Sequence, residues 1–251
     1  MKILITSGGT KIPIDRVRSI TNMSKGTFGS KIANEFFREC MRRTARRDLK
    51  QIEKITFFMA KNSARPDAES INNELFDDDS RIFEYVEYST FDEYKEGVEN
   101  LLKNETYDII VVAAAVSDYG VANYYNGKYR SREDDMCIKL VKLPKVLPIM
   151  RELAPNAIIC GFKLLVDSTD EELIDAMNKQ IVESKVDLVV GNDLRDIKAD
   201  DHRLLIMKPT GECKKYSQPP KAERTVMTRN CLAEAVVKEC LESYKAKGGR
   251  A

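Results

Sequence analysis

Two pairs of glycines near the start of the chain could let a ligand approach the backbone closely. The segment ITSGGTKIPIDRVRSITNMSKGTFG contains Gly8 and Gly9, and further on Gly26 and Gly29. Glycine has no Cβ, so a phosphate can come close to the main chain of such a loop. The residues from Ser24 to Gly29 also lead into an expected helix N-terminus, which attracts anions. A single glycine pair is explained as often by a plain turn, whereas the two together favour phosphate binding.

The separation of the glycine pairs weakens the case for a nicotinamide cofactor. A Rossmann dinucleotide loop keeps its glycines in one tight turn and usually has an acidic residue at the end of the second strand. Here sixteen residues separate Gly9 from Gly26, and the second expected strand ends in Lys61 and Asn62. An NAD(P)-dependent reductase of the extended Rossmann type remains the alternative function, although no Tyr-x-x-x-Lys pair lies in a suitable helix.

The sequence lacks the motifs of P-loop nucleotide hydrolysis and of catalysis by a protein nucleophile or a multi-histidine zinc site. There is neither a Walker loop G-x-x-x-x-G-K-[ST] nor a nucleophile elbow G-x-S-x-G. The single histidine, His202, sits among charged residues and cannot build a multi-histidine zinc site. The chain offers amides, hydroxyls, a few cations and one or two carboxylates. That set suits the binding and polarising of phosphates and carbonyls better than nucleophilic attack by the protein.

Strand-like and helix-like segments alternate along the chain, which predicts the elements that must position these groups. The expected fold is a single α/β domain over residues 1–251: a Rossmann-like, doubly wound, mostly parallel sheet with helices on both faces. A small β-hairpin is expected at 202–217. Strands are expected at 2–6, 54–60, 82–89, 107–116, 157–165 and 186–193, and helices at 26–40, 91–104, 144–154, 169–184 and 224–244. Thr169 and Glu172 predict a capping box for the fourth helix.

Ligands of an open parallel sheet bind beyond the carboxyl ends of its strands. That rule selects Ser7–Thr10, Ser117–Tyr119, Lys163 and Asn192–Asp193, each of which follows or ends an expected strand. We expect these four groups to converge on one crevice.

Two segments fit neither the helical nor the strand period. The first, Tyr119–Asp135, is rich in Tyr, Asn, Gly and charge, and a loop of this length inside a compact domain is usually functional or disordered. The second, 64–80, carries an acidic run that we interpret as a solvated excursion. The basic stretch 41–54 is interpreted as solvated surface.

Composition narrows the class of protein. The 251 residues carry a net charge of +1, which gives no general reason to expect nucleic acid or an anionic membrane as partner. No apolar run approaches the roughly 20 residues that a membrane span needs. Because the sequence opens directly on an expected strand, we expect no signal peptide. The six cysteines form no C-x-x-C pair. We therefore expect reduced thiols and a cytoplasmic location.

The opening segment resembles the signature of the phosphopantothenate–cysteine ligases, also called phosphopantothenoylcysteine synthetases. That family carries S/A-G-G-T, then P-I-D-x-V-R, then I-[ST]-N-x-S-x-G-x-x-G. The similarity continues in AAAVSDY, KLVKLPK, GFKLLVDST and VVGNDL, and so spans nearly the whole chain in order. The GFKLLVD version and the lack of an attached decarboxylase domain resemble the free-standing bacterial-type form. The signature positions are Gly8, Gly9, Thr10, Pro13, Ile14, Asp15, Val17, Arg18, Asn22, Ser24, Gly26 and Gly29.

The resemblance implies a reaction of coenzyme A biosynthesis. The carboxylate of 4′-phosphopantothenate attacks the α-phosphate of a nucleoside triphosphate, and pyrophosphate leaves. The amine of L-cysteine then attacks the acyl-nucleotide and releases the nucleoside monophosphate. The resemblance favours CTP over ATP, and implies Mg²⁺ with the nucleotide and a homodimer with a flap at about 119–135. The tyrosines of YGVANYYNGKY suit such an interface.

The same resemblance implies roles for individual residues and leaves the metal ligands unknown. Asn22, Arg18 and Lys128 are the expected catalytic residues, with Asn22 donating to the acyl oxygen. The expected nucleotide-binding residues are Gly8, Gly9, Thr10, Ser24, Gly26, Gly29, Ala113, Ala114, Ala115, Asp118, Lys128, Phe162, Lys163, Lys179, Asn192 and Asp193.

Each role has a structural alternative. Asn22 could cap a helix, Arg18 could pair with Asp15, and Asp118 could cap the following loop. Lys128 could be a solvated charge, and the neighbouring Arg130 and Arg132 leave open which cation of the flap contacts phosphate. Asn192 and Asp193 could form a turn, and an exposed helix position is the favoured interpretation of Lys179.

Overall fold

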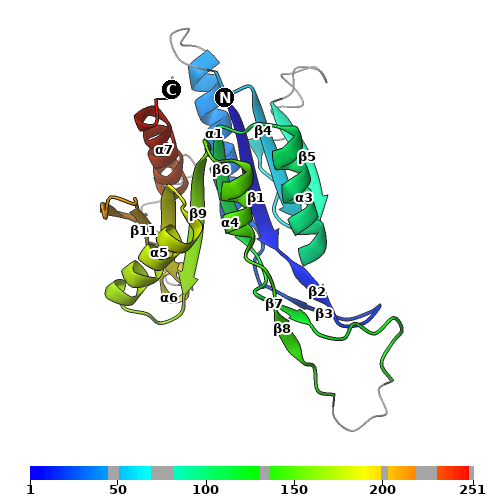
Figure 1. The fold of residues 1–251 in the computed structure, drawn as a ribbon. Helices are drawn as coiled ribbons and strands as arrows, with labels where there is room; N and C mark the ends of the chain where they lie inside the picture. Colours follow the sequence, from blue (N-terminus) through cyan, green and yellow to red (C-terminus); the bar gives the residue numbers. More distant parts are fainter. Residues whose placement is uncertain (45–50, 69–81, 131–135, 199–202, 219–230, 249–251) are drawn as a thin grey trace.

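An eight-stranded sheet forms the centre of the structure, a computed structural model that describes residues 1–44, 51–68, 82–130, 136–198, 203–218 and 231–248 (Figure 1). The strands follow the order β12-β11-β10-β9-β6-β1-β4-β5. The six strands from β10 to β5 are parallel, and β11 and β12 are added antiparallel at one edge. The strands are β1 (Lys2–Gly9), β4 (Lys54–Ala60), β5 (Phe83–Tyr88), β6 (Ile109–Ala115), β9 (Ile158–Leu165), β10 (Leu188–Asp193), β11 (Arg203–Met207) and β12 (Cys213–Ser217).

The central strands are apolar without alternation because both faces of the sheet are covered. In β1, Ile3 and Ile5 enter the core on one face, while Leu4 between them enters a second core on the other. β6 repeats this arrangement, with Ile109 in the first core and Ile110 in the second. The two-sided burial fixes these strands in the middle of the sheet.

Helices cover both faces of the sheet (Figure 1). Phe36 of α1 packs in the first core and Met150 of α4 in the second, and both are fully buried. The first face carries α1 (Thr27–Thr44) and α7 (Cys231–Ala246), and the second carries α3 (Phe91–Asn104), α4 (Val146–Leu153) and α5 (Asp170–Ser184). A short helix, α6 (Leu194–Lys198), follows β10 directly.

The predicted capping box at the start of α5 is present. The Thr169 hydroxyl accepts from the Glu172 N–H at 3.2 Å, and the Glu172 carboxylate accepts from the Thr169 N–H at 2.9 Å. Thr90 and Glu93 form the same motif at the start of α3. Each box satisfies two N–H groups that a helix N-terminus leaves unpaired.

Two hairpins of short strands project beyond the carboxyl ends of the central strands (Figure 1). β2 (Lys11–Pro13) pairs with β3 (Ser19–Thr21), and β7 (Tyr119–Val121) pairs with β8 (Leu140–Lys142). β2 and β7 contact each other. We call residues 11–24, 119–130 and 136–142 together the arm.

The expected fold class is confirmed, including the strand at 82–89 and the hairpin within 202–217. The prediction of a loop throughout Tyr119–Asp135 was wrong at its start, because Tyr119–Val121 forms β7. Three residues are too few to show a strand period. His202, Arg132, most of the excursion 64–80 and the start of the helix expected at 224–244 lie outside the described residues. No helix in the described ranges has the length and apolar character to cross a membrane.

Candidate functional site

The first glycine pair lies at the carboxyl end of β1, beside the end of β6. Gly8 is in register with Ala114, and Gly9 with Ala115. From β1 the chain continues to β4 on one side and later returns to β6 on the other, so the strand order reverses here. Open α/β sheets bind ligands at such a reversal point. The structure therefore brings together the candidate positions Gly8, Gly9, Ala113, Ala114 and Ala115.

The second glycine pair folds back against the first. Ser7 donates its hydroxyl to the Gly26 carbonyl at 3.0 Å. A Cβ at Gly29 would lie 2.3 Å from the Ser7 Oγ, so only glycine fits without a shift. The Ser24 hydroxyl accepts from the Gly26 N–H at 3.4 Å, at the entry to α1. The turn from β1 to α1 is therefore compact in space, although a hairpin is inserted into it in sequence.

Asn22 ends that inserted hairpin and returns to the strand ends. Its Nδ2 donates to the Ala115 carbonyl at 2.7 Å and lies 3.4 Å from the Ser117 Oγ. Thr10 joins the same cluster, because its N–H donates to the Ala115 carbonyl at 3.2 Å and its hydroxyl lies 2.9 Å from that of Ser117. A Cβ at Gly9 would meet the Asn22 carbonyl oxygen at 2.7 Å. Gly9, Thr10 and Asn22 thus meet at the end of β6.

Arg18 forms the ion pair with Asp15 that the sequence left open. Its Nη1 lies 3.0 Å from Asp15 Oδ2, and its Nη2 donates to the Tyr129 carbonyl at 3.3 Å. The Arg18 side chain is still 36% exposed, whereas that of Asp15 is fully buried. Lys128, next to Tyr129, is exposed. Arg18 and the segment of Lys128 are therefore adjacent within the arm.

Asp118 follows β6 and lies at the base of the arm. Its carboxylate lies 2.6 Å from Lys145 Nζ, and both side chains are more than half exposed. The Leu143 N–H donates to the Asp118 carbonyl at 2.9 Å, where the chain returns from β8. Among the described residues, no group of three or more His, Cys, Asp or Glu side chains could hold a metal ion by itself. One exposed carboxylate is nevertheless enough for Mg²⁺ that arrives with nucleotide phosphates.

Three further candidates lie on β9 and α5. The Phe162 ring packs edge-to-face against Phe28 of α1, with ring centroids 6.0 Å apart. This contact places Phe162 beside the helix that Gly26 and Gly29 open. Lys163 is half-buried and in register with Gly191 of β10. Lys179 is 74% exposed on α5, 3.9 Å from Glu183 of the same helix, and no described contact links it to the cluster around Asn22.

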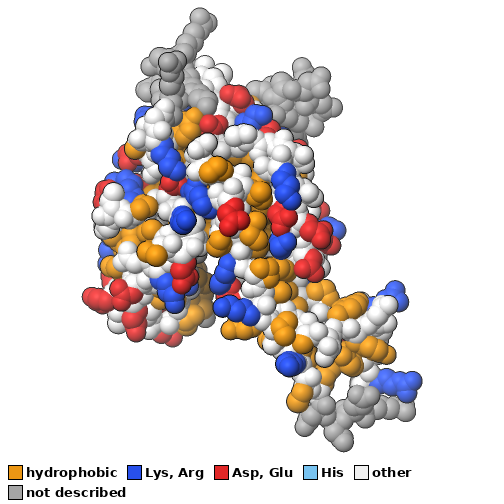
Figure 2. All heavy atoms as spheres, viewed as in Figure 1, with side chains coloured by type: hydrophobic (Ala, Val, Ile, Leu, Met, Phe, Trp, Pro, Cys, Tyr) orange, Lys and Arg blue, Asp and Glu red, His pale blue; other side chains and the backbone are white. Residues whose placement is uncertain are grey.

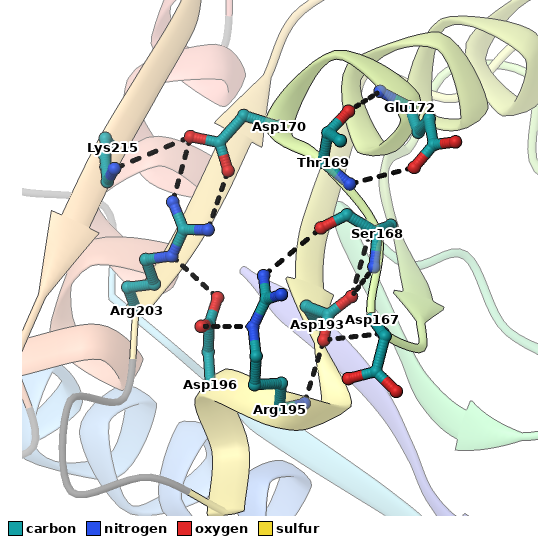
Figure 3. Close-up of polar contacts among 10 residues, drawn as sticks. All are labelled: Asp167, Ser168, Thr169, Asp170, Glu172, Asp193, Arg195, Asp196, Arg203 and Lys215. Atoms are coloured by element: carbon teal, nitrogen blue, oxygen red, sulfur yellow. Dashed lines mark hydrogen bonds and ion pairs between the residues drawn. The ribbon is translucent and has the colours of Figure 1, made fainter.

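Asp193 holds the turn that follows β9 (Figure 3). Its carboxylate accepts from the N–H groups of Asp167 at 3.1 Å, Ser168 at 2.8 Å and Arg195 at 2.8 Å. The Ser168 hydroxyl adds a fourth bond at 2.8 Å. These bonds, that of the Ser168 N–H foremost, lower the pKa of Asp193 to about 2. Asn192 beside it is half-buried, and nucleotide contacts by Asn192 and Asp193 remain predictions.

A second part of this network ties the edge hairpin to α5 and α6 (Figure 3). Arg203 of β11 lies 2.7 Å from the Asp170 carboxylate and 2.6 Å from that of Asp196. Lys215 of β12 lies 3.6 Å from Asp170. The hydrogen bond with Asp170, opposed by burial, raises the pKa of Arg203. The network therefore fixes the loop after β9 from two sides.

Two residues of the site are missing from the candidates drawn from the sequence. Asp15 is a signature position, but the sequence gives it no role beyond pairing with Arg18, whereas in the structure it also accepts from the Tyr129 N–H at 3.2 Å. Lys145 was not considered, although it pairs with Asp118. A local sequence signal exists only for the turn that Asp15 closes. Its carboxylate accepts from the N–H groups of Val17 and Arg18, two and three residues later, as in an Asx turn.

Comparison with known sequences gives one consistent family. The model of the DNA/pantothenate metabolism flavoprotein C-terminal domain matches residues 1–48 and 76–238. The coenzyme A biosynthesis bifunctional protein CoaBC of Thermococcus kodakarensis is 31% identical over 207 residues, which cover 82% of this chain and 44% of that protein. The Haemophilus influenzae protein of the same name is 25% identical over 250 residues, which cover 98% of this chain and 52% of that protein. The chain thus spans about half the length of these curated relatives.

Solved structures share the fold. The DNA/pantothenate metabolism flavoprotein from Streptococcus pneumoniae superposes with a TM-score of 0.74 at 24% identity, covering 98% of this chain and 99% of that one. A complex of a Cab2 mutant with phosphopantothenate-cysteine superposes with a TM-score of 0.75 at 19% identity, covering 98% of this chain and 87% of that one. At these identities the similarity establishes the fold alone.

Proposed function

This chain belongs to the family of the DNA/pantothenate metabolism flavoprotein C-terminal domain, and from that premise we propose that it is a phosphopantothenate–cysteine ligase of coenzyme A biosynthesis. One observation of the structure carries the proposal beyond the family. The hairpin inserted between β1 and α1 returns Asn22 to the Ala115 carbonyl, at the point where the strand order reverses. A nicotinamide-dependent reductase, the alternative, would instead keep its glycines within one tight turn, with no hairpin inserted between them.

The first step forms an acyl-nucleotide. The carboxylate of 4′-phosphopantothenate attacks the α-phosphate of the nucleoside triphosphate, an acyl–phosphate bond forms, and pyrophosphate leaves with the electron pair of the broken bond. The N-terminus of α1, which follows the loop of Ser24 and Gly26, offers main-chain N–H groups for the phosphates. Arg18 and Lys128 supply positive charge from the arm.

The second step joins cysteine to the acyl group. The amine of L-cysteine attacks the acyl carbon, the nucleoside monophosphate leaves, and the amine loses a proton. The Ala115 carbonyl orients the Asn22 amide, because only its NH₂ side can donate to a carbonyl oxygen. The second N–H of that group donates to the Ser117 Oγ over a long 3.4 Å, and we propose that the acyl oxygen takes the place of this hydroxyl as negative charge develops there. No protein nucleophile is needed in either step.

We include Mg²⁺ and CTP in the proposal, with ATP as the alternative nucleotide. Mg²⁺ bound to the triphosphate would neutralise its charge, and Asp118 is the exposed carboxylate at the strand ends that fits it. Phe28 and Phe162 offer an apolar surface beside α1 for a base. Nucleotide choice rests on the family resemblance. A cytoplasmic location is supported by six cysteines that are all free.

A homodimer is proposed from the surface of the arm. Figure 2 shows hydrophobic side chains gathered on the arm. Contiguous exposed apolar surface on a protein commonly marks an interaction site. The arm accounts for most of the exposed large hydrophobic residues that the structure describes, namely Val17, Ile20, Met23, Tyr119, Tyr124, Tyr125, Met136, Leu140 and Val141.

One assay tests the proposed function. The protein is mixed with 4′-phosphopantothenate, L-cysteine and Mg²⁺, with either CTP or ATP, and pyrophosphate and the cysteine conjugate are quantified. We expect both products with CTP, and pyrophosphate without conjugate when cysteine is omitted. An absence of pyrophosphate with both nucleotides would reject the ligase. Oxidation of NADPH by candidate carbonyl substrates would instead support the reductase.

A further inference from the structure

Asp15 is a buried carboxylate in the turn between β2 and β3. The residue is 3% exposed, and its side chain has no exposed surface. Oδ1 accepts from the N–H groups of Val17 at 2.8 Å and Arg18 at 2.7 Å, and so closes the turn. Oδ2 accepts from Arg18 Nη1 at 3.0 Å and from the N–H of Tyr129 at 3.2 Å. The two oxygens therefore act on different parts of the chain, one locally and one across the arm.

The segment of Lys128 is held on both sides by this turn. The N–H of Tyr129 is bound by Asp15, and its carbonyl accepts from Arg18 Nη2 at 3.3 Å. The Gly127 carbonyl accepts from the Arg16 N–H at 3.0 Å. Lys128 thus lies between two residues whose main chains are fixed to the β2–β3 turn, while its own side chain is exposed.

The charges of Asp15, Arg18 and Lys128 explain why this segment needs to be held. Arg18 and Lys128 are both cations, and a free loop would move like charges apart. Burial opposes ionisation of Asp15, but the N–H groups of Val17, Arg18 and Tyr129 and the charge of Arg18 together lower its pKa. The carboxylate is therefore charged at neutral pH and offsets one of the two positive charges. A polyanion such as a triphosphate could then meet Arg18 and Lys128 together.

We propose that Asp15 is a positioning residue of the ligase reaction, which fixes the main chain around Lys128 relative to Arg18 so that both cations face the nucleotide. This inference rests on the proposed function. It assigns to Asp15 no contact with substrate. Its effect passes through Oδ2 and the main chain of Tyr129.

The variant Asp15→Asn separates the two roles of this side chain, which are closing the turn through Oδ1 and holding Arg18 and Tyr129 through Oδ2. The remaining amide oxygen can still close the turn, but an NH₂ group in place of Oδ2 cannot accept from Tyr129 or Arg18. The lost charge-assisted bonds predict a KM for the nucleotide raised by about tenfold or more, with the KM for cysteine unchanged. Asp175→Asn, at an exposed position of α5, is the matched control and should behave as wild type.

Two further measurements distinguish positioning from a general loss of structure. Trypsin should cleave the Lys128–Tyr129 bond faster in Asp15→Asn than in wild type, as followed by mass spectrometry without any substrate. In a Lys128→Ala background, where only the effect through Arg18 is left, Asp15→Asn should raise the KM for the nucleotide by less than it does in wild type. Equal cleavage rates, or an undiminished effect in that background, would overturn the inference. Failure of the wild-type protein to make pyrophosphate would reject the proposed function, and the cleavage rates would still show whether Asp15 holds the segment.

Discussion

The side-chain amide of Asn22 donates to the Ala115 carbonyl at 2.7 Å, across 93 positions of sequence. Ala115 ends β6 and is in register with Gly9 of β1. The N–H of Thr10 donates to the same carbonyl at 3.2 Å. The Ala115 carbonyl oxygen therefore joins the ends of β1 and β6 to the hairpin that is inserted before α1, and it orients the Asn22 amide of the proposed reaction.

Replacing Asn22 by alanine should block the second chemical step more than the first. Loss of one donor to a developing oxyanion costs about 10²–10³-fold in rate, whereas loss of one hydrogen bond costs only about 1 kcal/mol of stability. We expect conjugate formation to collapse while the acyl-nucleotide accumulates, as quantified by chromatography of quenched reactions. Asn178→Ala, exposed on α5, serves as control. Normal turnover by Asn22→Ala would remove this residue from catalysis.

The contact of Gly29 with Ser7 should make alanine at position 29 destabilising. Its Cβ would lie 2.3 Å from the Ser7 Oγ and 2.8 Å from the Ser7 Cβ. Overpacking of this kind costs about 1–3 kcal/mol, as measured by urea unfolding. Lys31→Ala, exposed on the same helix, should have little effect.

A double variant tests the physical cause of that loss. Ser7→Gly removes the side chain that the new Cβ would meet, so Ser7→Gly with Gly29→Ala should be more stable than the sum of the single changes predicts. Additive losses would show that the clash is relieved elsewhere.

The sheet could be predicted from sequence because its signals are local. Runs such as IIVVAAA in β6 are apolar without alternation, which indicates a strand buried on both faces. The residues at the strand ends then follow from a general rule about open sheets. The cap at Thr169 is likewise encoded within four residues.

The arm and the carboxylate contacts could not be predicted in the same way. β7 and β8 are three residues each, and exposed apolar residues such as Leu140 and Val141 obscure any alternation. The carboxylate of Asp15 accepts a hydrogen bond from Tyr129, 114 positions away in sequence, and that of Asp193 accepts one from Ser168, 25 positions away. Nothing in a local pattern tells which N–H groups a carboxylate will meet after folding.

Asp193 should make stability depend on pH in the acid range. Its pKa is about 2 in the folded protein, because the N–H groups around it favour the charged form, and about 3.9 when unfolded. Its contribution is therefore complete above about pH 4 and is lost as pH falls towards 2. Asp193→Asn should unfold at a lower urea concentration than wild type at pH 6, and the difference between the two urea midpoints should narrow between pH 4 and 2. A difference that stays constant with pH would contradict this account. The control Asp175→Asn should have the same urea midpoint as wild type.

The exposed apolar surface of the arm should control oligomeric state. Leu140→Asp places a charge on a surface that the proposed dimer would bury, where an unpaired charge is costly. Val182, 76% exposed on α5, provides the matched control Val182→Asp. Light scattering should show a dimer for wild type and the control, and a monomer for Leu140→Asp. A wild-type monomer at all concentrations would reject the dimer.

The ion pair of Asp118 with Lys145 should compete with Mg²⁺. The two groups are 2.6 Å apart and both more than half exposed, so removing the pair should change stability by no more than about 1 kcal/mol. If Asp118 contacts Mg²⁺ of the bound nucleotide, Lys145 must leave it. Lys145→Ala should then lower the Mg²⁺ concentration for half-maximal pyrophosphate release, and Asp118→Asn should raise it. Lys103→Ala, at an exposed position of α3, should leave the Mg²⁺ dependence unchanged. The same Mg²⁺ dependence in all variants would place Asp118 away from the metal and leave it as a support for the base of the arm.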